Sequence, residues 1–102
     1  MTKRVKKRMR PVHPGEILRE EYLVPLDMSV NALAHALRVP ATRLHEIIKE
    51  RRAITADTAL RLARYFGGDA QSWMNLQAAY ELRSVDVEKG HRIAKEVDPR
   101  AA

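Results

Sequence analysis

Apolar residues recur three and four positions apart along most of this 102-residue chain, and no stretch alternates with a period of two. The first spacing is typical of amphipathic helices, whereas alternation would indicate half-buried strands. The sequence therefore predicts an all-α fold. The expected helices cover residues 16–23, 30–37, 40–49, 56–66 and 70–83.

Residues with strong preferences for helix ends mark these boundaries. Pro25 is expected to end the first helix, because the residue before a proline avoids the helical conformation. Ser29, Thr55 and Asp69 each precede a helix, where a side-chain oxygen can accept a hydrogen bond from a free N–H of the first turn. Gly67-Gly68 is expected to close the fourth helix, since glycine readily adopts the left-handed conformation of helix ends.

The helical pattern weakens after Ser84. Gly90 interrupts this stretch, and its apolar side chains stand isolated among charged ones: Val85, Val87, Ile93 and Val97. Residues 85–102 are therefore predicted to form a weakly helical tail or a short helix.

Positive charge is concentrated near the N-terminus. Residues 1–10 hold six of the 19 basic residues, whereas residues 11–102 hold 13 basic and 13 acidic residues. Within that neutral part, residues 38–64 carry seven basic and three acidic side chains. Clustered positive charge favours a polyanionic partner. We predict a basic flexible arm over 1–12, a DNA-binding domain over 13–84 and a C-terminal tail or short helix over 85–102.

Several classes of function find no support in the composition. The chain has no cysteine, which excludes disulfides and thiolate metal sites. The segment from His45 to Lys49 begins like the zinc-protease motif H-E-x-x-H, but a lysine stands where the second histidine is required. No apolar run approaches the roughly 18 residues that span a bilayer. We expect a cytoplasmic protein that is not an enzyme, binds no membrane and holds no metal or other cofactor.

Two of the predicted helices have the spacing of a helix-turn-helix. They are short and are joined by Arg38-Val39-Pro40. Ala34 is small where the helices cross, and Val39 fills the turn. Leu44 and Ile47 anchor the second helix to the core. Because this motif places its second helix in the major groove, the expected partner is double-stranded DNA.

The buried side of the third helix determines which side chains face DNA. Burial of Leu44, Ile47 and Ile48 turns the opposite side to solvent. The residues expected to meet bases or nearby phosphates are Pro40, Ala41, Thr42, Arg43, His45 and Glu46. Carboxylates accept from cytosine, and arginine reads guanine or holds a phosphate. The residues expected at phosphates are Asn31, Lys49, Arg51, Arg52 and Thr55.

Five segments give the chain a resemblance to the HigA antitoxin family, a branch of the Cro/repressor-type helix-turn-helix proteins. They are HPGEIL at 13–18, NALAHALRVP at 31–40, RLHEII at 43–48, ITADTALRLARYFG at 54–67 and WMNLQAAYEL at 73–82. The resemblance implies a five-helix Cro/repressor-like domain and a homodimer that represses its own operon at a palindromic operator. It also implies a protein partner, a HigB-like mRNA endonuclease toxin that the antitoxin neutralises. The implied dimer contact lies around Trp73, Leu76 and Tyr80.

The chain departs from this family at two positions. Arg38 and Glu50 stand where members usually have glycine, at helix ends where φ is often positive. A residue with a side chain costs on the order of 1 kcal/mol there. We therefore expect a reshaped turn and a slightly re-aimed third helix.

Two other functions remain open from the sequence. One is a stand-alone helix-turn-helix transcriptional regulator without a toxin partner, and the other is a protein- or RNA-interaction module that no longer reads DNA. If a toxin is bound, the acidic first helix is a candidate surface, because an enzyme that cleaves RNA is expected to be basic. The acidic residues of that helix are Glu16, Glu20 and Glu21.

Overall fold

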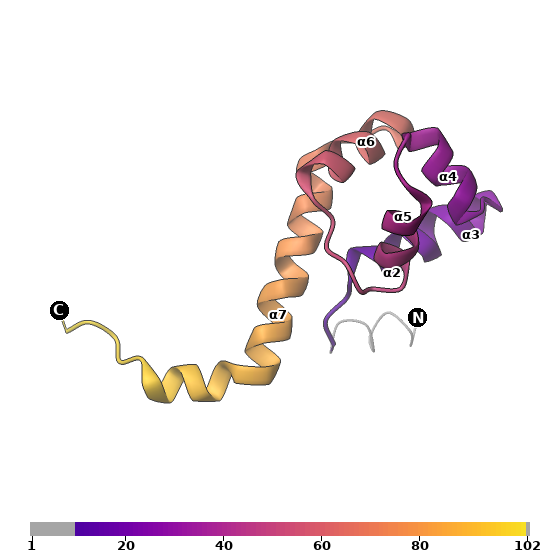
Figure 1. Cartoon of the computed structure of the whole chain (residues 1–102). Coiled ribbons are helices and arrows are strands. Elements are labelled where there is room, and N and C mark those ends of the chain that lie inside the picture. The colour runs from indigo at the N-terminus through magenta and orange to yellow at the C-terminus, as the bar shows by residue number, and fades with distance from the viewer. Residues whose placement is uncertain (1–9, 102) are drawn as a thin grey trace.

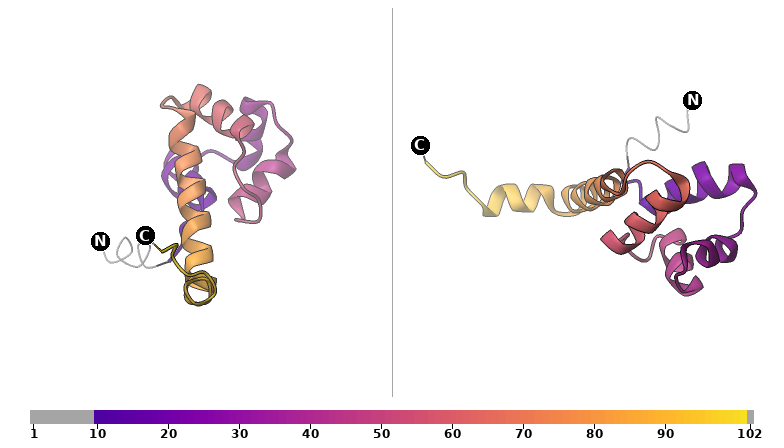
Figure 2. Two further views of the ribbon diagram at one scale, coloured as in Figure 1. Left: turned by 90° about the vertical axis from the view of Figure 1, so that its left-hand side faces the viewer. Right: turned by 90° about the horizontal axis from the view of Figure 1, so that it is seen from above.

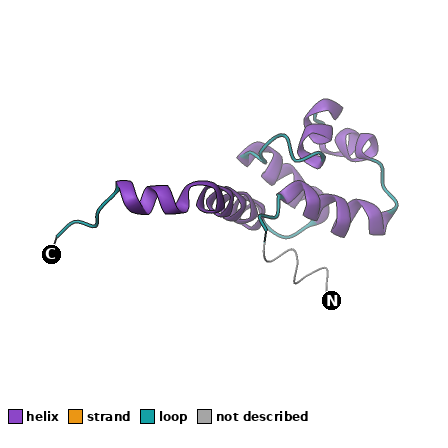
Figure 3. Cartoon of the chain, turned by 90° about the horizontal axis from the view of Figure 1, so that it is seen from below, coloured by secondary structure: helices purple, strands orange, loops and turns teal. Residues whose placement is uncertain are grey.

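The computed structural model describes residues 10–101, and every regular element among them is a helix (Figure 3). The basic arm predicted over 1–12 therefore lies mostly outside the described residues. The elements are α2 (Pro14–Leu18), η1 (Arg19–Leu23), α3 (Val24–Leu26), α4 (Val30–Leu37), α5 (Ala41–Ile48), α6 (Ala56–Phe66) and α7 (Ala70–Glu96). The all-α prediction is confirmed.

The first three elements follow one another without a break. η1 is π-helical, because the N–H of Val24 donates to the carbonyl of Arg19, five residues earlier. Pro25 does not end the helix as predicted. It lies inside this continuous run, directly after η1, where a proline costs one backbone hydrogen bond without ending the helix, and the helix ends instead at Asp27, whose φ is 51°.

The predicted caps of the later helices are confirmed. The side chains of Ser29, Thr55 and Asp69 accept hydrogen bonds from the N–H groups three residues later. Gly67 closes α6 with a φ of 90°, a conformation that favours glycine. The starts of α4, α6 and α7 therefore follow from local hydrogen bonding.

Residues from every helical run meet in one core. Leu18 comes from α2, Leu33 from α4, Leu44 from α5 and Leu62 from α6, and all four are fully buried. Trp73, at the start of α7, is 5% exposed and completes this core. Figure 2 shows the shorter helices grouped together, with α7 leaving the group at one side.

α7 does not end near Arg83, as the weakening pattern predicts, but continues to Glu96 (Figure 1). No proline interrupts residues 70–96, and a single glycine at Gly90 costs a helix only about 1 kcal/mol. Arg92 and Glu96 form an i,i+4 ion pair at 3.8 Å. Within residues 10–101, no helix, including the long α7, is long and apolar enough to cross a membrane.

Candidate nucleic-acid interface

α4 and α5 form the predicted helix-turn-helix. Ala34 is buried, and its carbonyl accepts the N–H of Val39 at 3.1 Å, which closes the turn. Arg38 adopts the left-handed conformation, with a φ of 58°. The expectation of positive φ at this position is therefore confirmed.

Buried apolar side chains fix the orientation of α5. Leu44 and Ile47 are fully buried, and Ile48 is nearly so. At the C-terminal end of α5, Arg19 Nη1 of η1 donates to the Ile48 carbonyl at 2.9 Å. Gly15 of α2 lies so close to α5 that a Cβ there would collide with the Ile47 carbonyl. α5 is therefore held from two directions, through its core side and through α2.

The residues predicted to face DNA are at the surface of this unit. Pro40, Thr42 and Lys49 are exposed, and Ala41, Arg43, His45 and Glu46 are half-buried. The other four residues predicted at phosphates are exposed too: Asn31, Arg51, Arg52 and Thr55. The anchored helix therefore presents a mixed polar face to solvent.

Neighbouring helices contact two of these side chains. His45 Nε2 lies 2.9 Å from Asn31 Oδ1, which links α5 to the start of α4. Arg43 Nη1 donates to Asp57 Oδ2 of α6 at 2.9 Å. The charged side chain of Arg61, joined by Arg43, holds the pKa of the Asp57 carboxyl below its usual range. Asp57 and Arg61 were not among the residues predicted for the site, although their i,i+4 spacing in an exposed helix favours an ion pair.

The loop from Lys49 to Thr55 presents the two arginines predicted at phosphates. Glu50 has a φ of 63°, and the Arg51 N–H donates to the Glu46 carbonyl at 2.8 Å. At the far end, the Ile54 N–H donates to the buried Gln77 Oε1 at 2.9 Å. The loop backbone is therefore fixed at both ends, while Arg51 and its neighbour Arg52 remain exposed.

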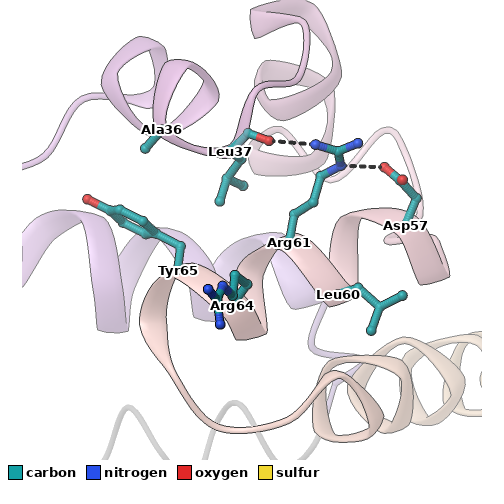
Figure 4. Close-up of a pocket in the computed structure, with 7 residues that line it drawn as sticks. All are labelled: Ala36, Leu37, Asp57, Leu60, Arg61, Arg64 and Tyr65. Carbon is teal, nitrogen blue, oxygen red and sulfur yellow. Dashed lines mark hydrogen bonds and ion pairs between the residues drawn. The ribbon is translucent and has the colours of Figure 1, made fainter.

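An open groove of about 530 Å³ lies between the end of α4 and α6 (Figure 4). Leu60 and Tyr65 are exposed in its wall. Arg61 crosses one end, where its Nη1 donates to the Leu37 carbonyl at 3.0 Å. Within residues 10–101, no three potential metal ligands of the His, Cys, Asp and Glu types come together.

The three residues implied in a dimer contact have different surroundings. Trp73 is buried in the core of its own chain, with its ring 5.4 Å from that of Tyr22. Leu76 and Tyr80 are half-buried, and the Tyr80 ring meets the ring of His13 edge-on at 4.8 Å. Burial lowers the pKa of His13, whose Nδ1 accepts the Gly15 N–H and so caps α2.

A sequence model of the helix-turn-helix family matches residues 18–73. Virulence-associated protein I of Dichelobacter nodosus is 61% identical over 84 residues, covering 82% of this chain and 78% of that protein. Antitoxin HigA-1 of Vibrio cholerae is 35% identical over 77 residues, covering 76% of this chain and 72% of that protein. The Pseudomonas aeruginosa antitoxin HigA, solved with the higBA promoter, is 49% identical and superposes with a TM-score of 0.87, covering 90% of this chain and 100% of that one.

Proposed function

The chain belongs to the HigA antitoxin family of helix-turn-helix proteins, and we propose that it binds a palindromic operator as a homodimer and represses its own operon. Its site of action is then the cytoplasm, and its role is binding rather than catalysis. The relative from Pseudomonas aeruginosa, which was solved with promoter DNA, supports this proposal.

One observation carries the DNA-binding proposal. α5 is anchored by Leu44 and Ile47, and its opposite side presents Thr42 and Glu46, which have side-chain groups suited to base edges. The loop that follows presents Arg51 and other basic groups, which suit phosphates. An anchored helix with a base-reading face beside phosphate-binding cations is the arrangement that major-groove recognition requires.

A binding titration tests the DNA-binding proposal. Purified protein is titrated with the duplex from directly upstream of its own gene and with a scrambled duplex of the same composition, at two salt concentrations. We expect a preference of about 10³-fold or more for the upstream duplex, which is typical of specific DNA-binding proteins. Equal and salt-sensitive binding to both duplexes would contradict the proposal.

The homodimer is supported by the outer part of α7, residues 82–96. Leu82, Val85 and Ile93 are 74%, 44% and 43% exposed in the single chain. At about 100° per residue, they occupy roughly a quarter of the helix circumference, an arc that Lys89 and Glu96 also share. A second copy would remove the three apolar side chains from water. Sedimentation should show a dimer that Leu82→Glu weakens and Val87→Glu, on another side of α7, does not. Equal weakening by both would contradict this contact.

We further propose that the protein neutralises a HigB-like toxin through the acidic side of its first helical run. Glu20 and Glu21 are exposed there, whereas Glu16, grouped with them from the sequence, is 5% exposed and pairs with Arg10 at 3.0 Å. Glu20 accepts from Arg19 Nε at 3.1 Å but its side chain stays 47% exposed, so both carboxylates are accessible to a basic partner.

Charge reversal separates this surface from a general charge effect. The double change Glu20→Lys and Glu21→Lys should abolish neutralisation of the toxin encoded beside this gene in a translation assay. The double change Glu88→Lys and Asp98→Lys, at two exposed carboxylates far from α2, serves as the matched control. Full neutralisation by the double variant would overturn the proposed surface, and the absence of an adjacent toxin gene would leave a stand-alone regulator.

A further inference from the structure

One ion-pair network connects three helices beside the DNA-facing side of α5. Asp57 Oδ2, in the first turn of α6, accepts from Arg43 Nη1 at 2.9 Å and from Arg61 Nε at 3.0 Å. Arg61 also donates through Nη1 to the Leu37 carbonyl, at the end of α4 (Figure 4). The carboxylate therefore holds a side chain of α5, and the arginine that shares it is itself fixed to the turn.

The network limits where Arg43 can place its guanidinium group. The Arg43 side chain is 27% exposed, and its Nη1 lies 2.9 Å from Asp57 Oδ2 of α6. A guanidinium group carries five N–H donors in a rigid fork, so an ion pair at one nitrogen restricts where the others can lie. The N–H groups that Asp57 does not engage therefore sample a narrower range of directions relative to α5.

That direction matters because an arginine near DNA has two competing partners. Phosphates attract it from any sequence through charge alone. The edge of a guanine accepts two of its N–H groups, which requires the fork to be correctly aligned. A carboxylate beside the arginine favours the second outcome, since it both orients the fork and opposes a shift toward the negative backbone.

We propose that Asp57 is a positioning residue that sets the DNA sequence preference of this protein without contacting DNA, by holding Arg43 for base recognition. The inference rests on the proposed DNA-binding function. It assigns to α6 a part in specificity that α5 alone does not explain.

A double-mutant cycle tests this role. The parent protein, Asp57→Asn, Arg43→Ala and the combined variant are each titrated with the upstream duplex and with the scrambled duplex at two salt concentrations. Asp57→Asn should reduce the preference for the upstream duplex about tenfold. It should leave binding to the scrambled duplex equal or tighter, with a steeper salt dependence, because Arg43 then reaches a phosphate. In the Arg43→Ala background, Asp57→Asn should not change the preference.

Two results would overturn the proposal. One is an unchanged preference in Asp57→Asn, and the other is the same loss of preference whether or not Arg43 is present. Glu88→Gln removes a carboxylate from the outer part of α7 and should change neither duplex. Thermal unfolding checks that each variant is folded, and Asp57→Glu, which keeps the charge but displaces it, should show a smaller loss of preference. A parent protein without any preference would instead refute the proposed function.

Discussion

The body of the molecule, residues 13–81, and the outer part of α7 are both helical, yet different interactions stabilise the helices of each region. In the body, Leu33, Leu44 and Leu62 are fully buried. In the outer part, Leu82 is 74% exposed, and an exposed ion pair between Arg92 and Glu96 spans one turn. Packing stabilises the first region, whereas local helix preference and a pair worth a few tenths of a kcal/mol stabilise the second.

The body therefore determines whether the chain folds, whereas the outer part of α7 determines what the folded chain associates with. A change in the body alters the free energy of unfolding, and through α5 it alters DNA binding. A side-chain truncation in the outer part removes no packing within the chain, so it affects mainly what α7 contacts, and only a glycine there changes the helix itself, by about 1 kcal/mol. Matched substitutions in the two regions test this division.

The largest contrast is expected between two leucines. Leu44→Ala removes a fully buried side chain and should lower the free energy of unfolding by about 2 to 5 kcal/mol. Leu82→Ala should change it by less than about 0.5 kcal/mol. Urea unfolding at a protein concentration below that of dimer formation measures both values. Similar losses for the two variants would refute the division.

Two glycines should respond in opposite directions. Gly15→Ala places a Cβ against the Ile47 backbone carbonyl, which cannot move without displacing α5, and should cost about 1 to 3 kcal/mol. Gly90→Ala meets only the end of the flexible Asp86 side chain and should stabilise the helix by up to about 1 kcal/mol. Thermal unfolding of both variants decides the matter, and stabilisation by Gly15→Ala would contradict the close approach of α2 to α5.

The body has a strained backbone at two positions, and relieving the strain there should produce a smaller increase in the free energy of unfolding. Arg38 and Glu50 have φ values of 58° and 63°, so changing each to glycine should stabilise the protein by about 0.5 to 1 kcal/mol. Glu88→Gly, in the interior of α7, should destabilise it by a similar amount. Urea midpoints provide the test, and destabilisation by both glycine variants of the body would show that their side chains matter more than the strain.

The smallest effect is expected from pH. Burial lowers the pKa of His13, so the unfolded chain binds more protons than the folded one between that lowered pKa and about 6.5. The free energy of unfolding should therefore fall as the pH drops below about 6.5. His13→Asn, which can still cap α2, should weaken this dependence, whereas His91→Asn in the outer part should not. An unchanged pH profile in His13→Asn would contradict the assignment.

Local signals predicted most of the body. The oxygens of Ser29, Thr55 and Asp69 cap helices as expected, because these bonds join residues three apart. Contacts between residues far apart in the chain could not be predicted in this way. The Arg43–Asp57 pair joins residues 14 apart in the chain, and neither periodicity nor composition indicates it. The continuation of α7 past Arg83 was missed for another reason, since its few apolar residues are exposed and separated by charged ones, which weakens the helical pattern.

The measurement that tests the central claim most directly compares Glu46→Ala, on the outer face of α5, with Arg52→Ala, in the loop after it. Each variant is titrated with the upstream duplex and with the scrambled duplex. If α5 reads bases and the loop holds phosphates, Glu46→Ala should weaken binding to the upstream duplex alone, by about 1 to 3 kcal/mol. Arg52→Ala should weaken both duplexes equally and flatten the salt dependence by about one unit. Equal losses on both duplexes for Glu46→Ala would contradict the claim that this face of α5 reads DNA sequence.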